Sequence, residues 1–382
     1  MVRYVIFVML FWCLHFLQIG NSNAQDTALM RGFKGTIGVY PILMTIGFSD
    51  DQPVNSNYCY TKYAKDIKIT HYFSKNKIIL KVNEESLHNY ETFELTFKDK
   101  NTLEGIWKTP KKTLPVKLVE ISEKDIASIM QNQNLQTYLQ KTEHSLSAYE
   151  LEKLNSIHFK KEYTKKYKGK EIIWLFDPKS ELRFFRLGQG FSDKEKAAMN
   201  PVLEQIHLDE AMAILSADIY TSNSYYNVED VQITFLSEKL LGFKINRAWD
   251  GGAYPDFSTI GYLYQLESGY AYDLDDVFNF GDRHTKENEK KFDEWSDYRI
   301  QQMAPIVYGL VQYYHDKEIE EDEQCVDVYD YNMEWAFADW YFTENGVVFI
   351  PSLPHVVAIC RVPFEIPYDA LQDYFTSGFK VK

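Results

Sequence analysis

The chain has 382 residues, of which 45% are apolar, 16% aromatic and 25% charged, with 18 Gly and 12 Pro. This composition is typical of globular proteins and excludes disordered, collagenous and fibrous chains. The 41 basic and 55 acidic side chains give a formal charge of −14 at pH 7. Nucleic-acid-binding proteins present a basic surface to the phosphate backbone, so that class is disfavoured. The length allows about two domains.

The first residues predict a cleavable secretory signal at 1–24. Arg3 precedes an apolar run over residues 4–19, and small residues follow as far as Ala24. The run is short for a membrane span, and no later apolar stretch is long enough, so no transmembrane anchor is predicted. Because the removed segment carries one Arg and no acid, the mature charge becomes −15. We expect export to the periplasm or the extracellular space, and neutral or basic partners.

Three cysteines remain after cleavage: Cys59, Cys325 and Cys360. A disulfide between Cys325 and Cys360 is one interpretation, because exported proteins mature in an oxidising compartment. Their spacing matches no disulfide framework. The favoured interpretation is therefore three unpaired thiols that pack as small hydrophobic side chains.

Residues 30–121 alternate apolar and polar side chains and are rich in aromatic and β-branched types. This period of two, broken by short polar turns, is typical of consecutive antiparallel strands. The pattern predicts a strongly curved β meander or a small barrel. The expected strands span residues 37–48, 57–63, 67–72, 77–83, 92–98, 102–108 and 114–121.

Three short runs in this region resemble a small β module that is common in exported Bacteroidetes proteins. They are GTIGVYPI at residues 35–42, YCYTKY at 58–63 and LEGIW at 103–107. The module often has Gly before its Tyr-x-Tyr pair, where this chain has Asn57. The resemblance implies a fold and no activity.

Residues 122–170 change to a helical period. Ser122 followed by Asp125 suits the start of a helix, and apolar residues such as Leu151 and Leu154 recur at helical spacing. We interpret this stretch as a linker of one or two helices, ending in a solvated basic connector over residues 160–170.

From residue 171 to 382 strands and helices alternate, which predicts a second α+β domain with a mixed or antiparallel sheet. Ser192, followed by two acids, marks the start of one helix over residues 192–207. The strongest helical pattern runs over residues 288–314. The expected strands span residues 172–176, 183–187, 215–226, 231–236, 241–249, 259–266, 340–343, 347–350, 355–357 and 361–367, and a short helix follows at 368–374.

Several runs in this second half resemble the RsiV-like domain of unknown function, found in a lysozyme-sensing anti-sigma factor and beside the catalytic domain of a peptidoglycan deacetylase. They are GGAYPD at 251–256, YLYQLESG at 262–269, YDLDDVF at 272–278, FTENGVVF at 342–349, PHVVA at 354–358 and FEIPYDAL at 364–371. The resemblance implies an exported domain that recognises lysozyme, or an accessory module, and no catalysis by the domain itself. Tyr254 stands where the family usually has His, Asp256 where Asn is common, and His355 with Val356 where it has Tyr-Glu.

The run around residue 251 also supplies the candidate ligand-binding residues, together with His355. Gly251, Gly252 and Pro255 are explained by a tight link between two strands. Alternatively the loop contacts a ligand, since aromatic side chains beside short acids suit sugar stacking and basic proteins. The candidate residues are Trp249, Asp250, Gly251, Gly252, Tyr254, Asp256 and His355.

The chain lacks the known catalytic and cofactor motifs. We find no nucleophile elbow, zinc-protease helix, P-loop or paired Cys-x-x-Cys, and no two histidines at the spacing of a helical metal site, so no metal or cofactor is predicted. The acids at 273–276 fit the start of a helix. The acidic run over residues 318–323 fits a solvated loop, or a docking face for a cationic protein.

Two hypotheses of function follow. The first is a noncatalytic, exported binding protein for a basic protein such as lysozyme or for a cell-wall glycan. The second is an enzyme, or an accessory domain, that acts on peptidoglycan or another glycan, with Asp250, Asp256 or Asp273 as the acid and base. A deep pocket with convergent carboxylates near Gly251 would favour catalysis, and a flat face would favour binding.

Overall fold

The computed structural model describes residues 29–48, 56–74, 77–82, 90–132, 135–136, 138–139, 146–217, 226–250, 255–282, 284–287, 291–321, 324–329 and 332–381. The predicted signal at residues 1–24 lies outside this part of the chain. The chain forms two compact units: Met1–Tyr58 with Lys68–Glu123 and Leu146–Glu150, and Cys59–Ile67 with Lys124–Ser145 and Leu151–Lys382. The predicted α+β class is confirmed.

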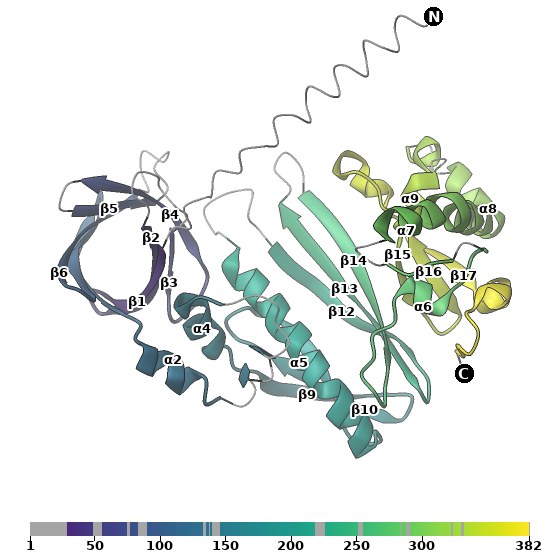
Figure 1. Ribbon diagram of the computed structural model, residues 1–382, viewed down its shortest axis with the longest axis horizontal. Coiled ribbons are helices and arrows are strands. Elements are labelled where there is room, and N and C mark those ends of the chain that lie inside the picture. The colour runs from purple at the N-terminus through teal and green to yellow at the C-terminus, as the bar shows by residue number, and fades with distance from the viewer. Residues whose placement is uncertain are drawn as a thin grey trace, which may run out of the picture. The chain divides into compact units, whose positions relative to one another are not determined.

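Eight antiparallel strands close into a barrel in sequence order, which Figure 1 shows almost end-on. Its interior is filled by fully buried side chains that include Phe33, Phe93 and Leu118. The barrel closes where β1 pairs with β8, with Gly35 opposite Leu118. The strands are β1 (Leu29–Ile37), β2 (Tyr40–Phe48), β3 (Ser56–Tyr60), β4 (Ile67–Ser74), β5 (Lys77–Val82), β6 (Glu91–Asp99), β7 (Thr102–Thr109) and β8 (Lys112–Glu120).

The sequence predicted one strand where the barrel has two. The run expected over residues 37–48 begins only at Tyr40, and a separate strand, β1, precedes it. The chain reverses at Gly38, which has a φ of +59°, a value that glycine adopts without strain. A Cβ atom on Gly35 would lie 1.9 Å from the carbonyl oxygen of Lys117, so β1 requires glycine there because β8 approaches closely.

The predicted linker is only partly a linker. Helices α2 (Glu123–Ile129) and α4 (Ala148–Asn155) form in it, but the basic stretch expected to be a connector forms the strand β9 (Lys160–Tyr167). β9 pairs with β10 (Lys170–Phe176), and β10 with β11 (Arg183–Leu187). The lysines stay exposed while Tyr163 stacks beside Trp174 of β10, with ring centroids 5.8 Å apart. Aromatic pairing across the strands therefore outweighs the polarity of the sequence.

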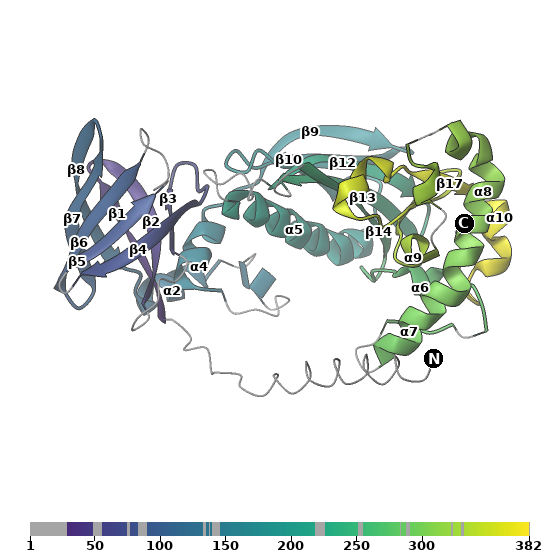
Figure 2. The same ribbon diagram turned by 90° about the horizontal axis from the view of Figure 1, so that it is seen from above.

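Helix α5 (Asp193–Ser216) packs against the strands of the second unit (Figure 2). It starts with a capping box, in which Ser192 N–H donates to Glu195 Oε2 at 2.6 Å and Glu195 N–H to Ser192 Oγ at 3.2 Å. The helix runs further than predicted and its C-cap is Ala217, so the strand predicted at residues 215–226 is wrong for its first three residues. Residues 218–225 lie outside the described part. The next sheet contains β12 (Tyr226–Leu236), β13 (Leu240–Asp250) and β14 (Pro255–Gln265).

The C-terminal part combines a third antiparallel sheet with several helices around one apolar core. Trp335, Phe342 and Phe349 are fully buried there. The predicted long helix is confirmed as α7 (Phe292–Tyr298), the π-helical η2 (Arg299–Met303) and α8 (Ala304–Glu321) in succession. The other elements are α6 (Leu274–Val277), η3 (Val326–Val328), α9 (Asn332–Ala336), β15 (Asp339–Phe342), β16 (Gly346–Ile350), η4 (His355–Cys360), β17 (Phe364–Pro367), α10 (Tyr368–Leu371) and η5 (Gln372–Tyr374).

Two further predictions are corrected in this region. Residues 355–357 were expected in a strand but begin the 3-10 helix η4, whose last residue, Cys360, is fixed by a disulfide. Residues 318–321 of the acidic run were expected in a loop but end α8, and residues 322–323 lie outside the described part. Among the described residues, no helix has the length and hydrophobicity needed to cross a membrane.

Candidate functional site

Three of the predicted site residues line one cavity of about 780 Å³ in the second unit. Trp249 comes from β13, Asp256 from β14 and His355 from η4. The antiparallel register places Trp249 opposite Asp256. Residues far along the chain, Asp339 of β15 and Arg361 after η4, add two charged side chains to the lining. Gly251, Gly252, Tyr254 and the side chain of Asp250 lie outside the described residues.

Asp256 fastens the η4 segment to β14. Its Oδ1 accepts a hydrogen bond from Arg361 Nη1 at 2.6 Å, and its Oδ2 lies 3.3 Å from His355 Nδ1. Arg361 also donates to the carbonyl oxygens of Leu353 and Phe257, each with a shortest distance of 2.6 Å. A carboxylate that is 7% exposed and held by such charge-assisted bonds is fixed in place and is poorly placed to exchange a proton with a substrate. This arrangement favours a structural role for Asp256 over acid–base catalysis.

Asp339 is the second carboxyl of the cavity. Burial raises its pKa to about 6, and the opposing attraction of Arg361 and Arg247 is too weak to bring the pKa back to its usual range. The sequence carries no signal for this residue, since an Asp at the start of a strand is unremarkable until the fold buries it. Its carboxyl can therefore change charge near neutral pH inside the cavity.

The Asp339 carboxyl is expected to make stability depend on pH. Between about pH 4 and pH 6 the folded chain holds a proton that the unfolded chain has released, so the free energy of unfolding falls as pH rises through this window. Above pH 6 the ionised Asp339 then costs up to about 3 kcal/mol. At pH 7, Asp339→Asn should be more stable than the wild type by up to this amount. At pH 4, the two proteins should have nearly the same free energy of unfolding.

Urea denaturation at pH 4, 5, 6, 7 and 8 checks this expectation. The exposed Asp327→Asn is the matched control, because it removes the same charge outside the cavity. A difference between Asp339→Asn and the wild type that stays constant over this pH range would contradict the raised pKa.

Three apolar side chains are exposed around the mouth of the same cavity. Val356 and Ile359 of η4 are 79% and 78% exposed, and Phe257 of β14 is 47% exposed. We call Val356, Ile359 and Phe257 the η4 rim. Large apolar side chains gathered at one place on a surface are typical of a protein-binding site. The resemblance pointed to residue 356 only as a departure from the family, and nothing in the sequence pointed to Ile359 or Phe257.

A disulfide holds the last residue of η4, the helix that carries two of the three η4 rim residues. Cys325 and Cys360 are bonded, with Cα atoms 5.5 Å apart and each side chain 2% exposed. The favoured interpretation of unpaired thiols is therefore wrong for this pair. Their spacing of 35 residues fits no framework because it reflects this fold, in which Tyr329 also donates its hydroxyl to the Cys360 carbonyl at 3.0 Å. Cys59 is fully buried in the barrel strand β3 and lies outside this bridge.

Asp273, the third acid of the enzyme hypothesis, does not line the cavity. It is the N-cap residue of α6, and its backbone N–H donates to Asp276 Oδ2 at 3.0 Å. Burial raises the pKa of Asp273, and the neighbouring Asp276 and Asp275 add to the shift. The described part of the chain thus brings Asp256 and Asp339 together, a pair that the sequence did not select, and leaves Asp273 in a capping role.

The cavity can hold a cationic or hydrogen-bonding group next to Asp339, between apolar walls. Within the described residues no cluster of three or more His, Cys, Asp or Glu side chains could hold a metal ion. The family resemblance of the motifs stays a prediction. No protein-family model and no curated protein matches this sequence.

Proposed function

We propose that this chain is an exported, noncatalytic binding protein that captures a basic protein on the η4 rim. The observation that carries the proposal is the exposure of Val356 and Ile359 on a short helix that a disulfide and an ion pair hold in place. Apolar side chains that gather at the mouth of a cavity are typical of a surface that a partner covers. Rigid presentation of the rim also lowers the entropy cost of binding.

Charge favours a basic partner. The mature chain carries −15, which attracts cationic proteins over long distances and speeds their encounter. Behind the rim, Asp339 offers one carboxyl to a Lys or Arg side chain that enters the cavity. Such a cation would lower the pKa of Asp339 and release its proton, so binding should strengthen as pH rises through 6.

Export is supported by the predicted signal and by the disulfide. Disulfides form and persist in oxidising compartments and are rare in the cytosol. The buried Cys325–Cys360 bridge is the kind that a periplasmic or extracellular protein keeps. The resemblance to the RsiV-like domain names lysozyme as a suitable basic protein, and lysozyme is therefore the probe for the first experiment.

The second candidate function is a glycan-modifying enzyme, which the raised pKa of Asp339 favours. Glycoside hydrolysis uses two carboxyl groups, and Asp256 is tied to Arg361 and His355. This pairing makes catalysis the weaker candidate. If the chain turned over cell-wall fragments and Asp339→Asn abolished that turnover, the enzyme would become the favoured function.

The test of binding is a calorimetric titration of the mature chain with lysozyme at low and moderate salt. We expect Val356→Asp and Ile359→Asp each to weaken binding at least tenfold, because a charge in the centre of an apolar contact reduces the binding free energy by about 1.4 kcal/mol or more. Val39→Asp is the matched control: Val39 is 83% exposed and lies in the turn between β1 and β2, in the other unit.

The titrations of the three variants distinguish binding at the η4 rim from binding elsewhere on the chain. Binding that falls in both η4 variants but not in Val39→Asp supports the rim as the docking surface. No heat signal with the wild type would reject lysozyme as the partner. Equal changes in all three variants, whether losses or gains, would show that the position of the added charge does not matter, and would reject the rim.

A further inference from the structure

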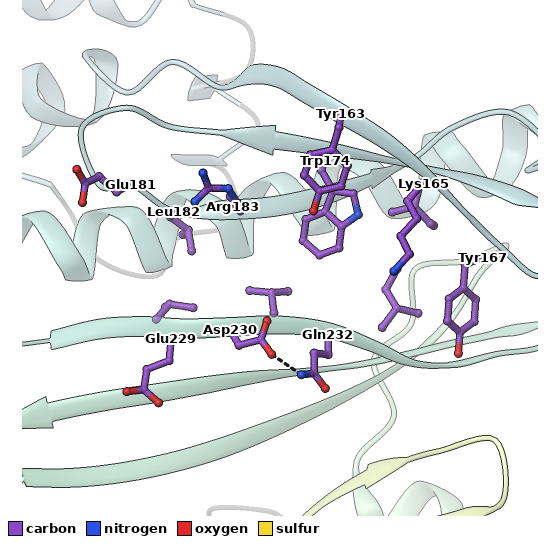
Figure 3. Close-up of a pocket in the computed structure, with 14 residues that line it drawn as sticks. Tyr163, Lys165, Tyr167, Trp174, Glu181, Leu182, Arg183, Glu229, Asp230 and Gln232 are labelled. Carbon is purple, nitrogen blue, oxygen red and sulfur yellow. Dashed lines mark hydrogen bonds between the residues drawn. The ribbon is translucent and has the colours of Figure 1, made fainter.

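A second cavity, of about 450 Å³, lies between two sheets of the second unit (Figure 3). One wall is formed by β9 and β10 and the other by β12. Its size falls within the range of small-molecule sites, about 300–1,000 Å³. It shares no lining residue with the cavity behind the η4 rim.

The wall of β9 and β10 carries an aromatic platform. Tyr163, Lys165 and Tyr167 alternate along one face of β9, and Tyr163 pairs with Trp174 across the two strands. The Tyr163 and Trp174 rings are stacked, with an angle of 19° between their planes. Tyr163 is 44% exposed, so one aromatic surface is left for a ligand. The opposite wall carries Asp230 and Gln232, joined by a hydrogen bond from the Gln232 amide (Figure 3).

The charges of the cavity argue against an anionic ligand. The guanidinium of Arg183 is already bound by Glu162, through Nε at 2.8 Å and Nη2 at 3.0 Å, and it also lies over the ring of Phe176. Of the remaining lining groups, the acids Glu181, Glu229 and Asp230 outnumber Lys165. A phosphate or a carboxylate would therefore meet net repulsion.

The charges of β9 argue against a peptide added as a further strand. β9 is the last strand of the sheet in the order β11-β10-β9, so its outer edge could in principle pair with another chain. The strand is rich in exposed lysines, with Lys160, Lys161, Lys165 and Lys166 in eight residues. Lysines on an edge strand are a common means of preventing such pairing.

We infer that this cavity binds a neutral saccharide, with a pyranose ring stacked on Tyr163 and Trp174. A pyranose presents one apolar C–H face, which suits an aromatic platform, and a rim of hydroxyls, which suits planar polar groups. Asp230 accepts hydrogen bonds from hydroxyl groups, and Gln232 both donates and accepts them. Stacking and hydrogen-bonding groups on opposite walls thus match the two kinds of surface of one sugar ring.

The test uses four tetrasaccharides as probes: fully N-acetylated chitotetraose, cellotetraose, maltotetraose and the acidic tetragalacturonate. The mature chain is titrated by calorimetry, and the indole N–H signal of Trp174, assigned with Trp174→Phe, is followed by NMR. We expect at least one neutral probe to bind at or below about 10 mM and to shift this signal. Tetragalacturonate should bind more weakly than that probe.

Three variants assign the binding to the platform. Tyr163→Ala should weaken it about tenfold, whereas Tyr163→Phe, which keeps the ring, should stay within about twofold. Tyr313→Ala removes a tyrosine that is 79% exposed on α8 and should change nothing. Far-UV circular dichroism and lysozyme titration of Tyr163→Ala should match the wild type, so a folding defect or failure of the η4 rim is recognised separately. No shift with any neutral probe, strongest binding of the acidic probe, or full affinity in Tyr163→Ala would overturn the inference.

Discussion

Lys153→Ala is expected to lower the free energy of unfolding of the second unit by about 3–5 kcal/mol. Lys153 of α4 is fully buried, and its Nζ donates to Asp66 Oδ1 and to the carbonyl oxygen of Leu215, each at 2.7 Å. A third bond runs to Ser216 Oγ at 3.3 Å. Removing the ammonium takes the Lys153 charge away from the Asp66 carboxylate, which is only 4% exposed and therefore gains little from water in exchange.

Urea denaturation of Lys153→Ala against the wild type measures this loss. Lys124→Ala is the matched control, because Lys124 is an exposed lysine of α2 and its removal should cost less than about 0.5 kcal/mol. The double variant Lys153→Met with Asp66→Leu removes both charges and should recover much of the lost stability. A Lys153→Ala chain within about 1 kcal/mol of the wild type would contradict the importance of the pair.

Loss of the Cys325–Cys360 disulfide is expected to lower the free energy of unfolding by about 4 kcal/mol. The bridge closes a loop with a sequence separation of 35, and the chain-entropy relation gives this magnitude for a loop of that length. The same change should weaken lysozyme binding, because Cys360 ends the helix that carries Val356 and Ile359.

The double variant Cys325→Ser with Cys360→Ser tests both effects by denaturation and by titration. A reductant should reproduce the loss of stability in the wild type and leave the double variant unchanged. If the variant kept wild-type affinity for lysozyme, the bridge would stabilise the fold without supporting the η4 rim.

The strands of the barrel could be predicted because alternation of apolar and polar residues is a local signal. β1 was missed because Gly32 and Gly35 weaken that signal, and they are present for reasons that only the fold reveals. A Cβ on Gly32 would lie 3.0 Å from the backbone nitrogen of Tyr149, and one on Gly35 would meet β8. Close approaches between segments far apart in the sequence leave no local pattern.

In the linker region, too, the burial of a side chain depends on long-range contacts that the sequence pattern does not indicate. Leu151 and Leu154 were predicted at apolar helical positions and are buried. Lys153 lies between them and gives no sign of its burial, which depends on Asp66 from a distant segment. In β9 the sequence did contain evidence of a strand, which was overlooked because of the many lysines. Tyr163 and Tyr167 have the even spacing that places side chains on one face of a strand.

The candidate site was predictable only in part. Trp249, Asp256 and His355 were selected from two separate runs, and they do line one cavity. Asp339 and Arg361 were not selected, since their importance comes from burial and from an ion pair across 105 residues. Chemistry that arises from long-range contacts is invisible until the chain is folded.

The contacts that hold η4 in place are different from the side chains that we propose to bind the partner. Asp256 holds Arg361 just after the helix, and Cys325 holds its last residue, so neither anchor uses Val356 or Ile359. Residues 356 and 359 can therefore change identity with little effect on folding. A lineage carrying this scaffold could exchange one partner for another through two outward-facing positions, much as an antibody framework tolerates new loop side chains.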